Sequence, residues 1–211
     1  MGAGVHELEK LTARQLGQLI DSGISAAVVP FGSVEYHGGH LPLGADAILA
    51  DAVGAEVARR LGAVLAPTVR VGCSGRHSHL PGTVTLDPET LARLAAEYAR
   101  ALARHGFTLI VLLSAHGGNQ PALDAAVAEL GALLPGVAVC APWGDVGPSP
   151  GAYSGAWLTS VMLALRPDLV DPARASPDLA ELESASAEQG RAHIERFTTS
   201  VVASVRPPNS P

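Results

Sequence analysis

Side chains with metal-binding chemistry follow a short apolar run near the start of the chain. The run Ala26 to Phe31 is uncharged and is typical of a strand that is buried on both faces. The next loop contains Glu35, His37, His40 and Asp46, and its glycines and Pro42 prevent a regular helix. Carboxylate oxygens and imidazole nitrogens are ligands that zinc and manganese bind in proteins. The stretch therefore predicts a metal-binding loop at the carboxyl end of a strand.

Spacing separates the roles of these four residues. Glu35 and His37 are two positions apart, so on an extended backbone they point to the same side and can face one site. Asp46 begins a helical stretch, where it is suited to cap the helix as well as to bind a metal. Each residue alone also fits a solvated loop position, but the four together favour Glu35, His37 and Asp46 as metal ligands. His40 is interpreted as a group that orients a neighbour.

Two later strand-like runs also end in loops that contain histidine. A strand is predicted from Ala63 to Val71 and leads into GCSGRHSHLPGTVTL, and the most apolar strand, Phe107 to Leu113, leads into SAHGGN. The carboxyl ends of parallel strands lie at one edge of a sheet, so these loops are expected beside the first. The side chains of these loops that could bind a metal or take part in catalysis are Arg76, His77, His79 and His116.

Helical segments alternate with the strands along the chain. This alternation predicts a layered α/β fold with a mostly parallel sheet. Helices are predicted after Thr12, from Asp46 to Leu61, from Pro88 to Arg104, from Pro121 to Leu134 with Asn119 as its cap, and from 187 to 205; a fourth strand is predicted from Val137 to Ala141 and is followed by a long loop that leads into LTSVMLALRPDLV.

Composition limits the class of protein. The 211 residues are 47% hydrophobic, so we expect one domain over residues 1–205, with 206–211 as a frayed tail. The net charge of −6 disfavours nucleic-acid binding. The two cysteines lie outside any CxxC pattern, and no apolar run reaches the roughly 20 residues of a membrane span. We therefore expect a cytoplasmic protein without a disulfide framework.

The three loops together resemble those of the creatininase (creatinine amidohydrolase) family. The resemblance is carried by PFGSVEYHGGHLPLGAD, GCSGRHSHLPGTVTL and HGFTLIVLLSAHGGN, with weaker support from SVMLALRPDLV and ASAEQG, in the family's order. It implies a three-layer α/β sandwich with a mostly parallel central sheet, assembled as a homo-oligomer, commonly a hexamer. It also implies that a zinc- or manganese-activated water hydrolyses a C–N bond, in an amide, cyclic amide or formamide, of a small molecule or peptide.

The resemblance also implies a ligand set. Glu35, Asp46 and His116 would hold one divalent metal ion, and His37 would hold a second, with Asp46 as the bridge between them.

The chain departs from the family's pattern at three positions. Relatives typically read H-A-G-x-x-E-T-S where this chain reads YSGAWLTS, so Tyr153 replaces a histidine and Leu158 replaces a glutamate ligand of the second metal. Arg76 stands where relatives often carry an acidic residue. Three consequences remain open. One metal ion alone could suffice; proton transfer could pass to His77, His79 or Tyr153; or the scaffold could serve a non-hydrolytic step, such as cyclisation, condensation or elimination, or no catalysis.

Overall fold

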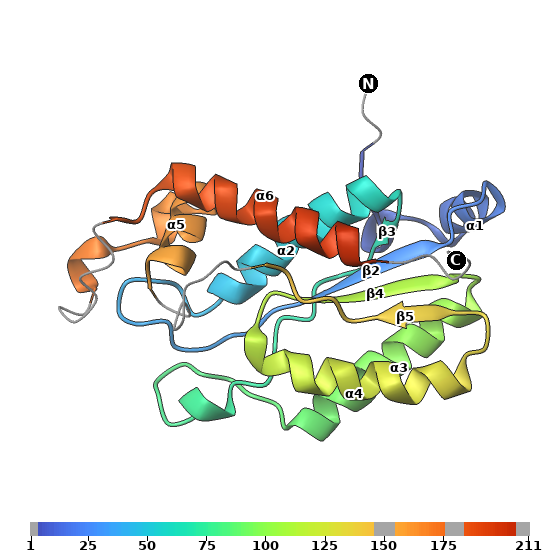
Figure 1. Cartoon of the computed structure of the whole chain (residues 1–211), viewed down its shortest axis with the longest axis horizontal. Helices are drawn as coiled ribbons and strands as arrows, with labels where there is room; N and C mark the ends of the chain where they lie inside the picture. The colour runs from blue at the N-terminus through green and yellow to red at the C-terminus, as the bar shows by residue number, and fades with distance from the viewer. Residues whose placement is uncertain (1–3, 146–154, 176–183, 206–211) are drawn as a thin grey trace.

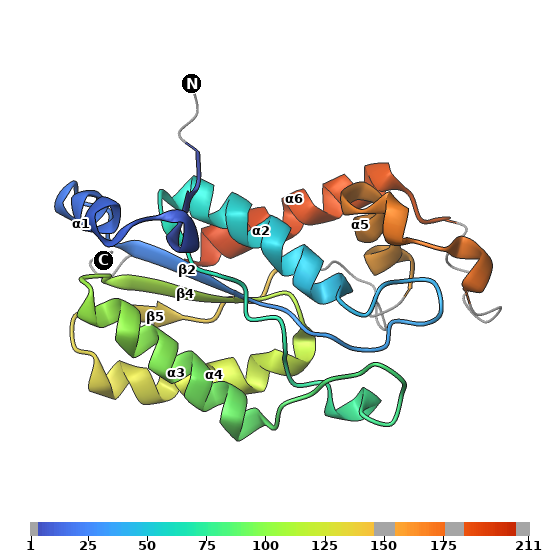
Figure 2. The same ribbon diagram turned by 180° about the vertical axis from the view of Figure 1, so that it is seen from behind.

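A parallel sheet forms the middle layer of the molecule. A computed structural model describes residues 4–145, 155–175 and 184–205 of the chain. Within these residues, helices cover both faces of the sheet (Figure 1), and the view from behind shows the same three layers (Figure 2). The predicted three-layer α/β sandwich is therefore confirmed.

The sheet of the described residues has the strand order β1-β3-β2-β4-β5, and neighbouring strands pair in parallel. The strands are β1 (His6–Glu7), β2 (Ala26–Phe31), β3 (Val64–Leu65), β4 (Leu109–Ser114) and β5 (Ala138–Cys140). β2 and β4 pair along their full length at the centre, from Ala26 opposite Leu109 to Phe31 opposite Ser114. Their carboxyl ends therefore release two loops side by side.

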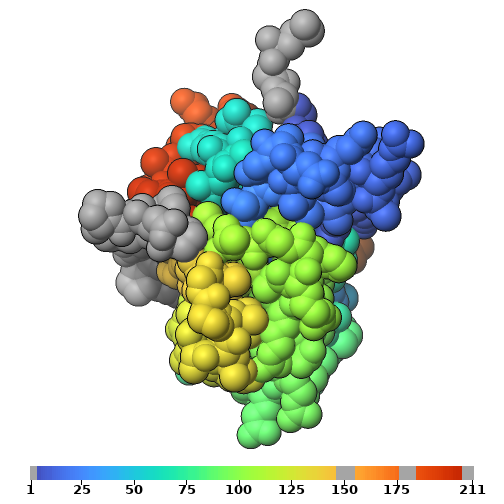
Figure 3. Space-filling model, turned by 90° about the vertical axis from the view of Figure 1, so that its right-hand side faces the viewer, coloured from blue at the N-terminus to red at the C-terminus, as the bar shows by residue number. Residues whose placement is uncertain are grey.

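Helices on the two faces pack into separate apolar cores. α2 (Ala45–Leu61), α5 (Ala156–Leu165) and α6 (Ala187–Ser204) lie on one face, and α3 (Pro88–Arg104) and α4 (Gln120–Leu133) lie on the other (Figures 1 and 3). Side chains alternate along each central strand, so Val28 joins the α2 side and Val29 joins the α3 side. Among the described helices, none combines the length and the apolar character that a bilayer crossing requires.

The first helix, α1 (Ala13–Asp21), begins at the predicted cap. The Thr12 hydroxyl accepts the Gln15 amide N–H at 3.3 Å, and the Gln15 side chain accepts the Thr12 amide N–H at 2.8 Å. This reciprocal pair satisfies two amide groups that a helix start leaves without partners.

Two details of the sheet differ from the sequence prediction. The strand predicted from Ala63 to Val71 is reduced to Val64–Leu65, because one extra residue interrupts the ladder between Ala66, which donates to Val28 O, and Val69, which donates to Pro30 O. The chain still runs beside β2, since Val69 N–H donates to Pro30 O at 2.9 Å. The edge strand β1 was not predicted, because two residues show no periodicity.

α5 and α6 approach each other closely at one glycine. A Cβ atom built at Gly190 of α6 would overlap the carbonyl oxygen of Ser160 in α5. The Ser160 hydroxyl also accepts the Ser186 amide N–H, at 3.1 Å, just before α6 begins. Gly190 therefore sets the distance between the two helices.

We expect Gly190→Ala to lower the free energy of unfolding by about 2 kcal/mol, because the two backbones must separate. Gly131→Ala is the matched control, since Gly131 lies in α4 with no atom within 4 Å of the added methyl group. The free energy of unfolding of this control should rise by up to about 1 kcal/mol, because alanine favours a helix more than glycine does. Denaturant unfolding of both variants checks this, and equal shifts would contradict the close approach.

Candidate metal centre

Four buried polar side chains meet at the carboxyl ends of β2 and β4. Glu35 and His37 follow β2, Asp46 lies in the first turn of α2, and His116 follows β4. Their exposed fractions are 1%, 1%, 3% and 4%, respectively. The structure therefore brings together the four residues predicted as metal ligands. Asp46 is not the helix cap, because Gly44 occupies that position.

Short distances join the donor atoms of this cluster. His116 Nδ1 lies 2.8 Å from Asp46 Oδ2 and 3.6 Å from Glu35 Oε1. His37 Nε2 lies 3.3 Å from Glu35 Oε1 and 3.4 Å from Asp46 Oδ1. Asp46 thus presents one oxygen to each histidine. One donor atom each from Glu35, Asp46 and His116 lies within 4.8 Å of the others, which is close enough to share one ion.

These contacts lack the directions of hydrogen bonds. Glu35 Oε1, His116 Nδ1 and both ring nitrogens of His37 are buried and have no hydrogen-bond partner among the described residues. Buried polar atoms without partners are costly. Carboxylate oxygens and imidazole nitrogens that converge in this way suit a divalent cation such as zinc or manganese.

The charges of the cluster compensate one another. Burial would raise the pKa of Asp46, but contacts with His116 and His37 hold it well below its ordinary value, and the pKa of Glu35 is lowered in the same way. Burial would lower the pKa of His37, but Asp46 and Glu35 outweigh it and raise that pKa to about 9. They also raise the pKa of His116. Without a metal, the two carboxylates thus favour the protonated form of both imidazoles.

Backbone contacts orient His116 as a ligand. Its Nε2 lies 3.0 Å from the carbonyl oxygen of Cys73, which can only accept a hydrogen bond. Nε2 therefore carries the hydrogen, and Nδ1 faces the two carboxylates with its lone pair once it loses its proton. On the other side of the cluster, the Ser33 hydroxyl donates to Asp46 Oδ2 at 2.9 Å.

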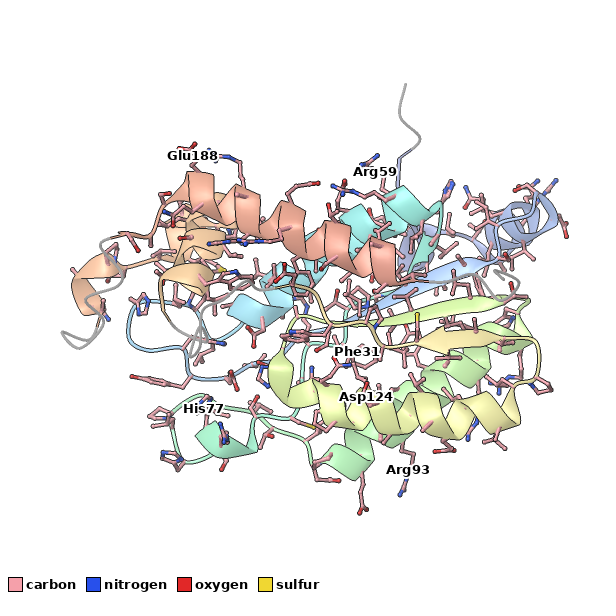
Figure 4. The ribbon with its side chains drawn as sticks, viewed as in Figure 1. Phe31, Arg59, His77, Arg93, Asp124 and Glu188 are labelled. Carbon is pink, nitrogen blue, oxygen red and sulfur yellow. The ribbon has the colours of Figure 1, made fainter. Side chains whose placement is uncertain are left out.

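A cleft of about 690 Å³ opens beside the cluster, and Glu35, Arg76, His77 and His116 are among the residues that line it. His77 Nδ1 lies 3.2 Å from Glu35 Oε2, and the side chain is 36% exposed. Figure 4 marks His77 on the loop beyond the carboxyl ends of the strands. His79 is exposed and is not among the residues that line this cleft. Tyr153 lies outside the described residues.

Comparison with known proteins agrees with this geometry. Residues 9–205 match the family model for creatininase, described as creatinine amidohydrolase. The chain belongs to the creatininase family. The resemblance seen in the three loops is therefore confirmed.

Individual members of the family extend this result. The chain is 39% identical over 164 residues to a mycofactocin precursor peptide peptidase of Mycolicibacterium smegmatis, covering 74% of this chain and 63% of the relative. It is 33% identical over 189 residues to a creatinine amidohydrolase of Pseudomonas putida, covering 77% and 72%. The chain thus spans less than two thirds of the length of the first relative.

Solved creatininase structures share the fold. A crystal structure of creatinine amidohydrolase superposes with a TM-score of 0.75 at 27% identity, covering 95% of this chain and 96% of that one. A structure titled creatininase Mn gives a TM-score of 0.77 at 27% identity, covering 94% and 96%.

Leu158 and His40 are not among the three residues whose donor atoms converge in the cluster. Leu158 is 2% exposed within the apolar core that α2, α5 and α6 share, and its side chain offers no ligand atom. His40 Nε2 lies 3.0 Å from the Thr159 hydroxyl of α5. His40 therefore contacts a neighbouring side chain, in agreement with its interpreted role.

Asn119 joins the three loops that carry the site. It was predicted to cap α4, but its side chain makes no capping bond. Instead, Asn119 Oδ1 accepts the Cys73 amide N–H at 2.8 Å, and Nδ2 donates to Gly32 O at 3.0 Å. The side chain is fully buried. Sequence reasoning missed this role because both partners are distant along the chain and carry no local signal.

We expect Asn119→Ala to lower the free energy of unfolding by about 2–4 kcal/mol, because it leaves a buried N–H and a buried carbonyl without partners. Ser22→Ala is the control, since it removes an exposed hydroxyl bonded to Leu19 O and should cost under about 0.5 kcal/mol. Denaturant unfolding compares the two, and similar losses would show that Asn119 does not join the loops.

Metal binding should release protons and strengthen as the pH rises. In the metal-free protein, the pKa of His37 is raised to about 9, which keeps this ring protonated at neutral pH, and the pKa of His116 is raised in the same direction, so a cation must displace protons. Calorimetric zinc titrations in buffers of different ionisation heat measure the release, which should be large near pH 7 and vanish above about pH 10. A buffer-independent heat at pH 7 would contradict it.

The metal-free protein should show the opposite dependence on pH. Raised imidazole pKa values contribute stability that is complete below the ordinary value of 6.5 and is lost as the pH rises through about 9. Unfolding of chelator-treated protein across this window is the companion measurement.

Proposed function

We propose that this chain is a metal-dependent amide hydrolase that cleaves a C–N bond of a small molecule or peptide. The buried cluster of Glu35, Asp46 and His116, with donor atoms that lack hydrogen-bond partners beside an open cleft, carries the proposal. Family membership supports it, because relatives are named as a creatinine amidohydrolase and a precursor peptide peptidase. The volume of the cleft also supports a small-molecule site, since about 690 Å³ lies within the usual range of such sites.

The ligand set proposed for the cluster is the one that the resemblance implies. Glu35, Asp46 and His116 would hold one ion, and His37 with the second oxygen of Asp46 would hold another. Zinc and manganese are the candidate ions, and solved creatininases are titled Zn-Zn type and Mn. Leu158 offers no donor atom where relatives typically carry a glutamate, so a single ion held by Glu35, Asp46 and His116 is the alternative.

A divalent cation held by these residues would supply an activated water molecule and would polarise an amide carbonyl. The chain's own groups would orient the ligands and carry protons. His77 is the favoured proton carrier among the predicted candidates, because it lines the cleft and lies 3.2 Å from Glu35 Oε2. His79 and Tyr153 remain the other candidates.

Assembly and location are further parts of the proposal. We infer a cytoplasmic homo-oligomer, hexameric by resemblance, that binds neither nucleic acid nor membrane. The net charge of −6 supports the absence of nucleic acid. Tyr36, Leu43 and Val84 expose apolar side chains. Backbone hydrogen bonds from Glu35 N–H to Leu43 O and from Val84 N–H to Val34 O hold their segments side by side. The apolar side chains that these segments expose support a contact between copies.

We expect Glu35→Ala and His116→Ala to abolish metal retention and to lower kcat/KM by at least about a hundredfold, because each removes a ligand. His77→Ala should keep the metal and lower kcat by about a hundredfold or more. Metal content per chain, measured on protein purified without added metal, and hydrolysis of cyclic amides, formamides and short peptides check these results. His105→Ala is the matched control, because His105 is exposed at the end of α3 and does not line the cleft.

Each outcome of this experiment decides between the candidate functions. Two metal equivalents would support the two-ion site, and one equivalent would support the single-ion alternative. Metal without hydrolysis would favour the non-hydrolytic use of the scaffold. No retained metal, with none taken up from zinc or manganese solutions, would overturn the proposed function.

A further inference from the structure

Arg76 places a permanent positive charge on the wall of the candidate cleft. It is the only arginine or lysine among the residues that line the cleft. Its side chain is exposed, and no described residue forms an ion pair or hydrogen bond with its guanidinium group. By contrast, Arg70 pairs with Asp51 at 2.6 Å, and Arg100 pairs with Glu97 at 2.7 Å. Arg76 is therefore available to a ligand.

The acidic groups that line the same cleft are already engaged. Asp87 accepts the amide N–H and the hydroxyl of Thr90, at 2.9 and 2.6 Å, at the start of α3. Glu35 belongs to the metal cluster and contacts His77. Neither carboxylate forms an ion pair with Arg76, and their negative charges repel a ligand group with two negative charges more strongly than a group with one. A singly charged carboxylate fits this field better than a phosphate does.

The backbone at Arg76 is held in place on both sides. His77 N–H donates to Ser74 O at 2.9 Å, and the Ser78 hydroxyl donates to Gly75 O at 2.8 Å. The short helical turn Gly75–His77 is thus closed by its own bonds. Since the next residue, His77, contacts Glu35, the base of Arg76 has a fixed position relative to the metal cluster.

We propose that Arg76 selects amide substrates that carry a carboxylate, such as N-acylated amino acids or peptides with a free carboxyl terminus. The planar guanidinium group can bind a carboxylate through two parallel hydrogen bonds while the amide lies at the metal cluster. This assignment rests on the proposed hydrolase function, and it adds the substrate class. Arg76 is a specificity-determining residue in this scheme, and the bond-breaking chemistry belongs to the metal cluster.

The test compares two ligands that differ only in this charge, N-benzoylglycine and N-benzoylglycinamide. Zinc-loaded full-length chain should bind the carboxylate about tenfold more tightly than the amide, the order expected of a charge-assisted pair at a partly exposed site. Arg76→Gln should remove the preference, and Arg76→Lys should keep part of it. Dissociation constants are measured by calorimetry, or KM values where a ligand is turned over.

Arg93→Gln is the matched control, because it makes the same change on α3, where Arg93 is exposed and projects away from the molecule (Figure 4). The control should keep the full preference. A preference that survives in Arg76→Gln would place the carboxylate on the metal and overturn the proposal. A wild-type protein that binds neither ligand at millimolar concentration, or binds both equally, would also overturn it.

The design separates this inference from the proposed function. Hydrolysis of other amides without any preference that depends on Arg76 would overturn the inference alone. Binding with an Arg76-dependent preference, but without hydrolysis of any amide, would overturn the hydrolase function and leave carboxylate recognition standing.

Discussion

The burial of two carboxylates beside two imidazoles is the constraint on which the rest of the structure depends. Glu35 and Asp46 are almost completely removed from water, where an uncompensated charge is too costly to persist. His37 and His116 supply the compensation, and they can do so as protonated rings or as neutral ligands of a cation. One divalent ion replaces two protons without changing the net charge of the cluster. A second ion adds positive charge, which must be balanced by further anions.

The sheet makes this burial possible because it fixes where the loops begin. β2 and β4 pair along their full length, so the loops that supply Glu35 and His116 leave the sheet as neighbours. Asn119 then ties both loops to the segment at Cys73. The ligand atoms are thus held by central strands and buried hydrogen bonds, and the approach of ligands is left to the exposed turn that carries Arg76 and His77. A binding site needs both features, because rigid elements keep the donor atoms in position and an exposed segment lets a ligand enter.

Much of this arrangement could be predicted from sequence where a local pattern determines the structure. The uninterrupted apolar run Ala26–Phe31 and the capped, periodic helix Pro88–Arg104 were predicted with the bounds they have. The residues of the cluster were singled out because their types and spacing are unusual after a buried strand. The role of Asn119 could not be found, because its partners are defined by tertiary contacts alone. The shortness of β3 could not be found either, because it results from one extra residue between Ala66 and Val69 in the pairing with β2.

The buried cluster and the carboxyl-terminal helices come from different parts of the chain. Glu35, His37, Asp46 and His116 all precede α4, while β5, α5 and α6 contribute no donor atom to the cluster in the described residues. A substitution at a residue of the last third of the chain, such as Leu158, therefore alters the apolar core without removing any donor atom of the cluster. Within this fold, the donor atoms of the cluster and the helices that cover them are encoded in separate parts of the chain.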